Sequence, residues 1–120
     1  MGETATKIYP TAADAEGWYY ENEDDEGAGI LTKMYDNESR VKKVELSKNR
    51  TAIIRELRGR DFNVIQDIIG GESRISMEAA TMSLSVKIND EGYPPEFFMD
   101  DLKLSDFSKL LIPVGRLNFS

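Results

Sequence analysis

The sequence contains no cysteine and no histidine among its 120 residues. These absences exclude disulfide bonds, thiolate metal ligands, cysteine nucleophiles and every catalytic or zinc site that depends on imidazole. The chain also lacks any run of eighteen apolar residues, so we expect no transmembrane helix. No basic segment followed by an apolar one opens the chain, so we expect no signal peptide. The length predicts one domain with a modest core.

The formal net charge is −7, and the negative charge is concentrated near the N-terminus. Residues 1–40 contain ten acidic and three basic residues, whereas residues 41–120 contain twelve of each. Five carboxylates occupy the six positions 21–26, and such a run repels itself and stays solvated. We predict an acidic, flexible arm over residues 1–29 and a single domain over residues 30–120.

The aromatic stretch GWYY at residues 17–20 directly precedes the acidic run. Two interpretations remain open. The aromatic side chains and the acids together form a docking segment for a basic, apolar partner, or Trp18 and Tyr19 fold back on the core of their own domain.

Three short β-prone runs follow: GILTKMYD, VKKVELS and TAIIREL. SKNR separates the last two tightly, as a hairpin turn does. Val44 and Leu46 alternate with Lys43 and Glu45, which indicates one buried and one solvated face. We predict an antiparallel β-meander over residues 30–57.

The periodicity changes after residue 60 from that of a strand to that of a helix. An apolar stripe from Phe62 to Ile69 predicts a helix that Gly70 and Gly71 end. A second helix is predicted over residues 73–88. A third is predicted to start at Ser105 and to end or kink at Pro113. The fold class is therefore α+β, with the meander followed by a compact three-helix unit over residues 61–120.

Arg55, Arg58 and Arg60 raise the question of a nucleic-acid surface, which needs several cations on one face. Arg55 lies within a predicted strand, whereas the other two flank Gly59 in a turn. Asp61 opens the next helix and would repel phosphate. The pattern therefore favours a strand–turn–helix junction, and we expect no nucleic-acid partner.

The acidic pairs Asp90-Glu91 and Asp100-Asp101 are the candidates for acid–base or metal chemistry. Such a site needs carboxylates that converge from separate elements, which neighbours in sequence do not indicate. The chain has no GxSxG, phosphate-binding or dinucleotide-binding motif. We predict no catalytic residue, no metal site and no cofactor, and therefore no enzyme.

The C-terminal region holds much apolar surface for its length. Some of it must close the core, and some can form a groove for the helix of a partner protein, and these two interpretations overlap. The candidate partner-binding residues are Phe97, Phe98, Met99, Phe107, Leu110, Leu111, Leu117 and Phe119.

Two stretches, VELSKNRTAIIRELRGRD and DDLKLSDFSKLLIPVGRLNF, resemble the tail assembly chaperones of tailed bacteriophages and related prophages. The resemblance covers about residues 41–120. Members show a strand, an (I/V)REL-x-G-(R/K)-D segment and a helix, and later an L-x-x-x-D-F-x-x-L helix. The matching residues here are Arg55, Glu56, Leu57, Gly59, Arg60, Asp61, Leu102, Asp106, Phe107 and Leu110.

The resemblance implies a non-catalytic protein that binds the long tape measure protein and keeps it soluble while the tail assembles. It implies residence in the cytoplasm of the bacterial host and absence from the mature virion. This chain would match the short form of the family. Further expected partners are a frameshifted long form of itself and the tail tube protein, with no membrane partner. The alternatives are a tail or neck completion protein of the virion and an acidic inhibitor that mimics DNA.

Overall fold

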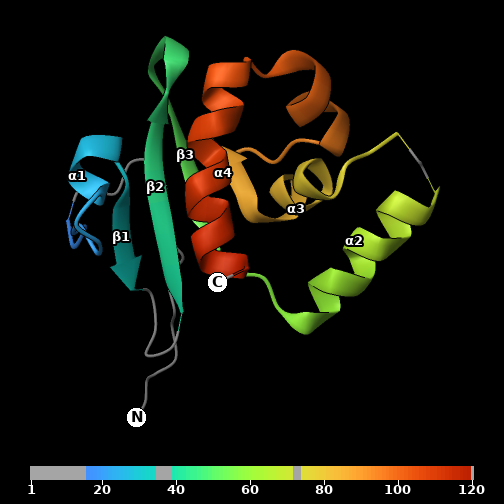
Figure 1. Ribbon diagram of the computed structural model, residues 1–120, viewed down its shortest axis with the longest axis horizontal. Helices are drawn as coiled ribbons and strands as arrows, with labels where there is room; N and C mark the ends of the chain where they lie inside the picture. Colours follow the sequence, from blue (N-terminus) through green and yellow to red (C-terminus); the bar gives the residue numbers. More distant parts are fainter. Residues whose placement is uncertain (1–15, 35–38, 72–73, 120) are drawn as a thin grey trace.

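The structure, a computed structural model, describes residues 16–34, 39–71 and 74–119, so residues 1–15 of the predicted arm lie outside the described part. Four strands form one antiparallel sheet in the order β1-β2-β3-β4 (Figure 1). The predicted α+β class is confirmed. The elements in chain order are α1 (Asp25–Ala28), β1 (Leu31–Met34), β2 (Arg40–Leu46), the 3₁₀ turn η1 (Ser47–Asn49), β3 (Arg50–Arg55), α2 (Gly59–Gly71), α3 (Met77–Ser85), β4 (Val86–Ile88), the π-helical turn η2 (Phe97–Asp101) and α4 (Leu104–Asn118).

The predicted meander is confirmed as strands β1, β2 and β3. Strands β2 and β3 pair with Val44 opposite Ala52, and both side chains are buried. Glu45 lies on the opposite face and is exposed, as the alternating pattern predicts. In the connecting turn, Lys48 and Asn49 adopt left-handed backbone at φ of 61° and 57°. This conformation lets the chain reverse within three residues.

The predicted helix over residues 73–88 is wrong at both ends, because α3 begins only at Met77, with Ser76 as its N-cap. Helix α3 stops before Val86, and the last three residues form strand β4, which pairs antiparallel with β3. Val86 lies opposite Ile54, and Val86 and Ile88 are buried while Lys87 is exposed. Three residues fit both a helical and a strand period, so pairing with β3 decides the conformation.

Helix α4 is longer than the segment predicted between Ser105 and Pro113. It begins one residue earlier and continues past the proline to residue 118. Pro113 has no N–H to donate to the Lys109 carbonyl, which normally costs about 3 kcal/mol. Leu110 and Val114 flank this position and are buried in the core. Their packing offsets the cost and holds the helix together.

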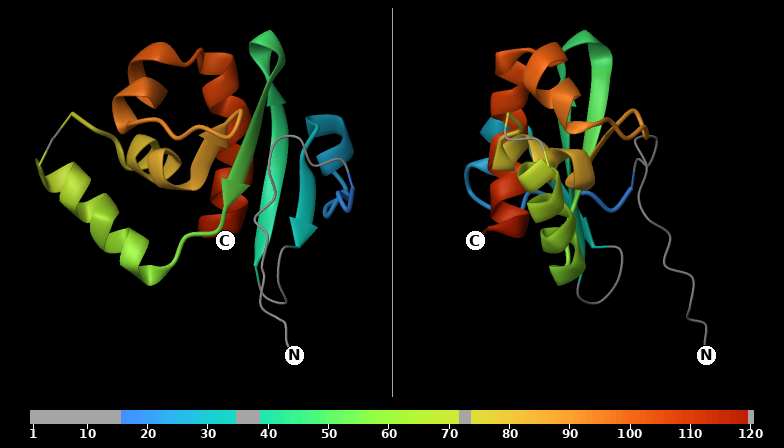
Figure 2. Two further views of the ribbon diagram at one scale, coloured as in Figure 1. Left: turned by 180° about the vertical axis from the view of Figure 1, so that it is seen from behind. Right: turned by 90° about the vertical axis from the view of Figure 1, so that its right-hand side faces the viewer.

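The core lies between the sheet and the helices α3 and α4, which cover the same face of the sheet (Figures 1 and 2). Helix α4 packs on β2 and β3, and α2 packs on α3 (Figure 1). Buried residues of the core include Val44, Ile54, Met82, Val86, Ile88, Phe98, Leu110 and Val114.

The segment over residues 16–29 differs from the flexible arm expected there. Tyr19 forms a β-bridge with Thr32 of β1, with N–O distances of 2.9 and 2.8 Å. Trp18 is half-buried, and Lys43 Nζ lies 4.5 Å from the centroid of its ring. These contacts support the interpretation that Trp18 and Tyr19 fold back on their own domain.

A partly buried ion network holds the acidic segment on the domain. Lys42 lies on the core face of β2, is 1% exposed and donates to Glu21 Oε1 and Thr32 Oγ1, both at 2.8 Å. Asp25 is fully buried in α1 and accepts a hydrogen bond from the guanidinium of Arg116 in α4. The acidic run is therefore ordered because cations that are distant in sequence neutralise part of it.

We expect the folded chain to lose stability in acid because several carboxyl groups have pKa values below their ordinary range. Burial raises the pKa of Asp25, but the hydrogen bonds from Asn22 and Arg116 and the charge of Arg116 lower it by a larger amount. The pKa of Asp25 therefore lies below its ordinary value. Glu21, which is bound to Lys42 and Arg40, also has a net lowered pKa. The other groups with a lowered pKa are Asp61 and Asp106.

The stabilisation from these groups is complete above their ordinary pKa values of 3.8 for aspartate and 4.5 for glutamate. The stabilisation decreases when the pH drops below those values. It is lost as the pH passes through the lowered pKa values that these groups have in the folded chain. Each proton taken up on unfolding contributes a slope of up to about 1.4 kcal/mol per pH unit. Denaturant titrations from about pH 6 to about pH 2 measure this loss. A free energy of unfolding that stays constant over that range would contradict the ion network.

Candidate binding surface along helix α4

The structure divides the eight candidate partner-binding residues into two groups. Phe98 and Leu110 are buried in the core, and Phe97 and Leu117 are half-buried against it. These four residues contribute mainly to the fold. The remaining four line pockets at the surface: Met99, Phe107, Leu111 and Phe119. The division is not complete, because Phe107 is also half-buried against the core and the buried Phe98 lines the same pocket as Met99.

One side of helix α4 connects these surface pockets. Leu104, Phe107, Leu111, Val114 and Asn118 follow one another at spacings of three and four residues. This spacing places them on one stripe of the helix. Each lines one of three pockets that succeed one another from the start of α4 to its end. We call this stripe and its three pockets the α4 face.

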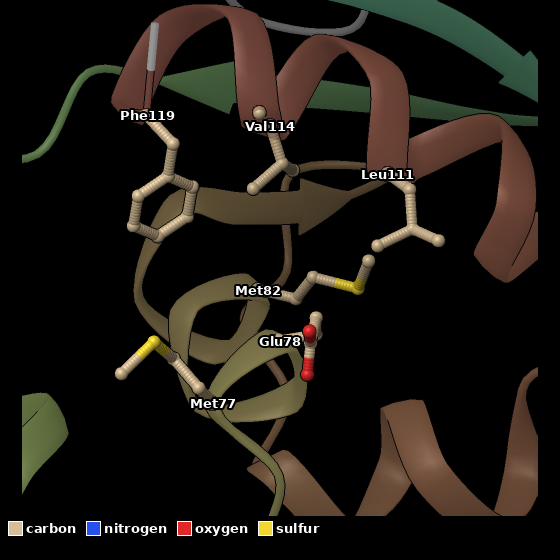
Figure 3. A pocket seen from close by; sticks show the side chains of 7 residues that line it. Met77, Glu78, Met82, Leu111, Val114 and Phe119 are labelled. Atoms are coloured by element: carbon tan, nitrogen blue, oxygen red, sulfur yellow. The ribbon is translucent and has the colours of Figure 1, made fainter.

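The middle pocket has a volume of about 280 Å³ and lies between α3 and α4 (Figure 3). Met77 and Met82 of α3 stand opposite Leu111 and Val114 of α4 and opposite Phe119, which directly follows α4. Methionine side chains are flexible and polarizable, so they adapt to differently shaped apolar partners. The pocket is therefore suited to apolar side chains of more than one shape.

Glu78 is the acidic residue of the middle pocket. It is exposed in the first turn of α3, where its charge is favourable to the helix dipole. Figure 3 shows its carboxylate on the side of the pocket where Leu111 lies, away from Phe119. The apolar floor thus has a negative charge at one edge.

The other two pockets extend the α4 face at both ends. The pocket at the start of α4 has a volume of about 260 Å³ and includes Met99, Leu104 and Phe107. The pocket at the end of α4 has a volume of about 220 Å³ and includes Arg58 and Phe62, and it shares Phe119 with the middle pocket. Phe119 therefore joins the middle pocket to the junction before α2.

Sequence reasoning missed three exposed apolar residues of this surface. Leu104 is 77% exposed and lies one residue before the predicted start of the third helix. Phe62, the first residue of the predicted apolar stripe, is 56% exposed, and Met77 of α3 is also exposed. The stripe over residues 104–118 exists only because the helix continues past Pro113, which the sequence did not predict. Nothing local indicates that α2 leaves Phe62 open.

Two of the three arginines of the junction bind other parts of the domain. Arg55 Nε donates to the Leu84 carbonyl at 3.1 Å, and Arg58 Nη2 donates to Ser39 Oγ at 2.6 Å. The Asp61 carboxylate accepts a hydrogen bond from the Arg58 backbone N–H at 2.7 Å. These contacts support the strand–turn–helix interpretation of this segment.

Glu56 and Leu57 of the matching motif also join elements. Glu56 Oε2 accepts a hydrogen bond from the Arg40 backbone N–H at 3.1 Å. The Leu57 backbone N–H donates to Asn118 Oδ1 at 2.7 Å, which links the segment after β3 to the end of α4. Arg60 is exposed in the first turn of α2. The motif therefore holds together the wall of the α4 face near Phe119.

The acidic pairs considered for catalysis or metal binding are exposed in the structure. Among residues 16–34, 39–71 and 74–119, no three carboxylates are grouped so that they could hold a metal ion. Within the same part of the chain, no helix is long and apolar enough to cross a membrane.

No protein-family model, no curated protein and no solved structure matches this chain. A function is therefore inferred from the sequence resemblance and from the α4 face.

Proposed function

We propose that this chain is a non-catalytic tail assembly chaperone of a tailed bacteriophage, which binds the tape measure protein and keeps it soluble. The observation that carries the proposal is the α4 face, a row of three apolar pockets on one side of a helix. A tape measure protein of the family to which the resemblance points is long and largely helical, with exposed apolar stripes. Such a stripe needs a complementary apolar surface to stay soluble.

The acidic segment is better suited to solubility than to DNA mimicry. A DNA mimic needs carboxylates displayed across a rigid surface. Here Glu21 binds Lys42 and Arg40, and Asp25 binds Arg116. Part of the acidic run is therefore paired with cations of the same domain and is not displayed to a partner. The net charge of −7 still repels other copies of the chain, which favours a soluble chaperone.

Co-expression with the tape measure protein encoded beside this chain tests the proposal. We expect the wild-type chain to raise the soluble fraction of the tape measure protein and to copurify with it. The double variant Leu104→Glu/Phe119→Glu should lose both effects because it places charge on the apolar stripe. Both side chains are largely exposed, at 77% and 63%, so the fold should tolerate the change.

Tyr20→Glu is the matched control, because Tyr20 is 50% exposed and lies outside the α4 face. This variant should still solubilise the tape measure protein. A tape measure protein that stays insoluble with the wild-type chain would contradict the proposal. The remaining alternative is a tail or neck completion protein. Mass spectrometry of purified virions distinguishes it from a chaperone, since a chaperone is absent from the particle and a completion protein is present.

A further inference from the structure

The α4 face has a negative charge at its middle pocket and a positive charge at its C-terminal pocket. Glu78 lines the middle pocket, and Arg58 lines the pocket at the C-terminal end of α4. Both side chains are exposed, and the apolar ring of Phe119 lies between these pockets.

The shape of the surface indicates that its occupant is a helix. The stripe on α4 repeats at alternating intervals of three and four residues, the pattern with which one helix packs against another. Helix α4 has 15 residues and a length of about 22 Å. A partner helix of about four turns therefore spans all three pockets.

We infer that the α4 face binds an amphipathic helix with a bipolar charge pattern, basic beside Glu78 and acidic beside Arg58. The inference rests on the proposed function, because it describes the kind of segment that a chaperone of this type would recognise. The apolar stripe supplies affinity, and the two charges select which helices bind and in which register. A uniformly basic helix meets a like charge at Arg58, and a uniformly acidic helix meets one at Glu78.

Three fluorescent synthetic peptides of about 18 residues test this inference. They share one apolar heptad stripe and differ only in flanking charges, which are bipolar, all lysine or all glutamate. The wild-type chain should bind the bipolar peptide about fivefold more tightly than either uniform peptide, measured by fluorescence anisotropy. The preference should shrink in high salt because both protein charges are exposed.

Charge reversals in the protein should redirect this preference. Glu78→Lys makes both positions basic and should favour the all-glutamate peptide. Arg58→Glu makes both positions acidic and should favour the all-lysine peptide. The double variant should again prefer the bipolar peptide, which shows that the variants are folded and that the two charges act together.

Two controls carry the same changes of net charge outside the α4 face. Glu23→Lys lies in the turn before α1, and Lys87→Glu lies on β4. Both side chains are exposed, and both variants should keep the wild-type order of peptides. Controls that shift the order as much as Glu78→Lys and Arg58→Glu would overturn the inference, because net charge alone would then explain binding.

Other outcomes overturn the inference in distinguishable ways. If no peptide binds, the surface is not a helix-binding site. If sedimentation shows a dimer that the Leu104→Glu/Phe119→Glu variant disrupts, the occupant is a second copy of this chain. If the uniform peptides bind as tightly as the bipolar one while the tape measure protein is still solubilised, the charge selectivity fails and the proposed function stands.

Discussion

Replacing Leu110 by alanine is expected to destabilise the folded chain by about 2–5 kcal/mol. Leu110 is 0% exposed and packs in the core beneath α4, so its loss leaves a cavity between the helix and the sheet. Urea denaturation followed by circular dichroism measures the change as a lower midpoint with an unchanged slope.

Leu111→Ala is the matched control for this prediction. Leu111 is the next residue of α4 and is 38% exposed in the middle pocket, so its replacement should cost about 1 kcal/mol or less. The same variant should weaken binding to the bipolar peptide. Equal losses of stability at the two positions would contradict the division of the candidate residues into core and surface.

Replacing Asp106 by alanine is expected to destabilise the chain by about 2–3 kcal/mol. The Asp106 carboxylate is fully buried and accepts hydrogen bonds from the Ser47 backbone N–H at 3.0 Å and from Arg50 Nη2 at 3.2 Å. Without the carboxylate, these donors lose their partner where water has little access. Thermal and urea denaturation measure the loss.

Asp101→Ala provides the comparison, because Asp101 is exposed and lies just before α4. Its replacement should change the free energy of unfolding by about 0.5 kcal/mol or less. Asp106→Asn should fall between the two, since the amide keeps an acceptor for Ser47 but loses the charge that attracts Arg50. A loss as small as that of Asp101→Ala would show that Asp106 does not anchor the helix.

The role of Asp106 illustrates how a sequence motif and a structure differ in content. The resemblance singles out Asp106 and Phe107 as neighbours in an L-x-x-x-D-F pattern. In the structure the aspartate joins α4 to the β2–β3 turn, and the phenylalanine lines a surface pocket. Their positions in the sequence show that they lie on different sides of the helix. Only the tertiary contacts show that Asp106 anchors the helix and that Phe107 lines the surface.

The sequence predicted the kind of residue that forms the candidate site but not which individual residues belong to it. The excess of phenylalanine and leucine near the C-terminus indicated a core, a groove or both. Five of the eight candidates line the pockets of the α4 face, while Leu104, Phe62 and Met77 line them but were not among the eight. A helical stripe has the same spacing whether it contacts the core or solvent, so periodicity alone does not separate the two.

The sequence by itself determined the parts of this protein that depend on neighbours in the chain. Alternation and a tight turn specify the β2–β3 hairpin, and the arginine-rich junction marks the passage from β3 to α2. Only the tertiary structure decided the rest, because each remaining feature depends on contacts between distant residues. Strand β4 forms by pairing with β3, α4 continues past Pro113 because its flanking residues are buried, and residues 16–29 are ordered by cations from β2 and α4.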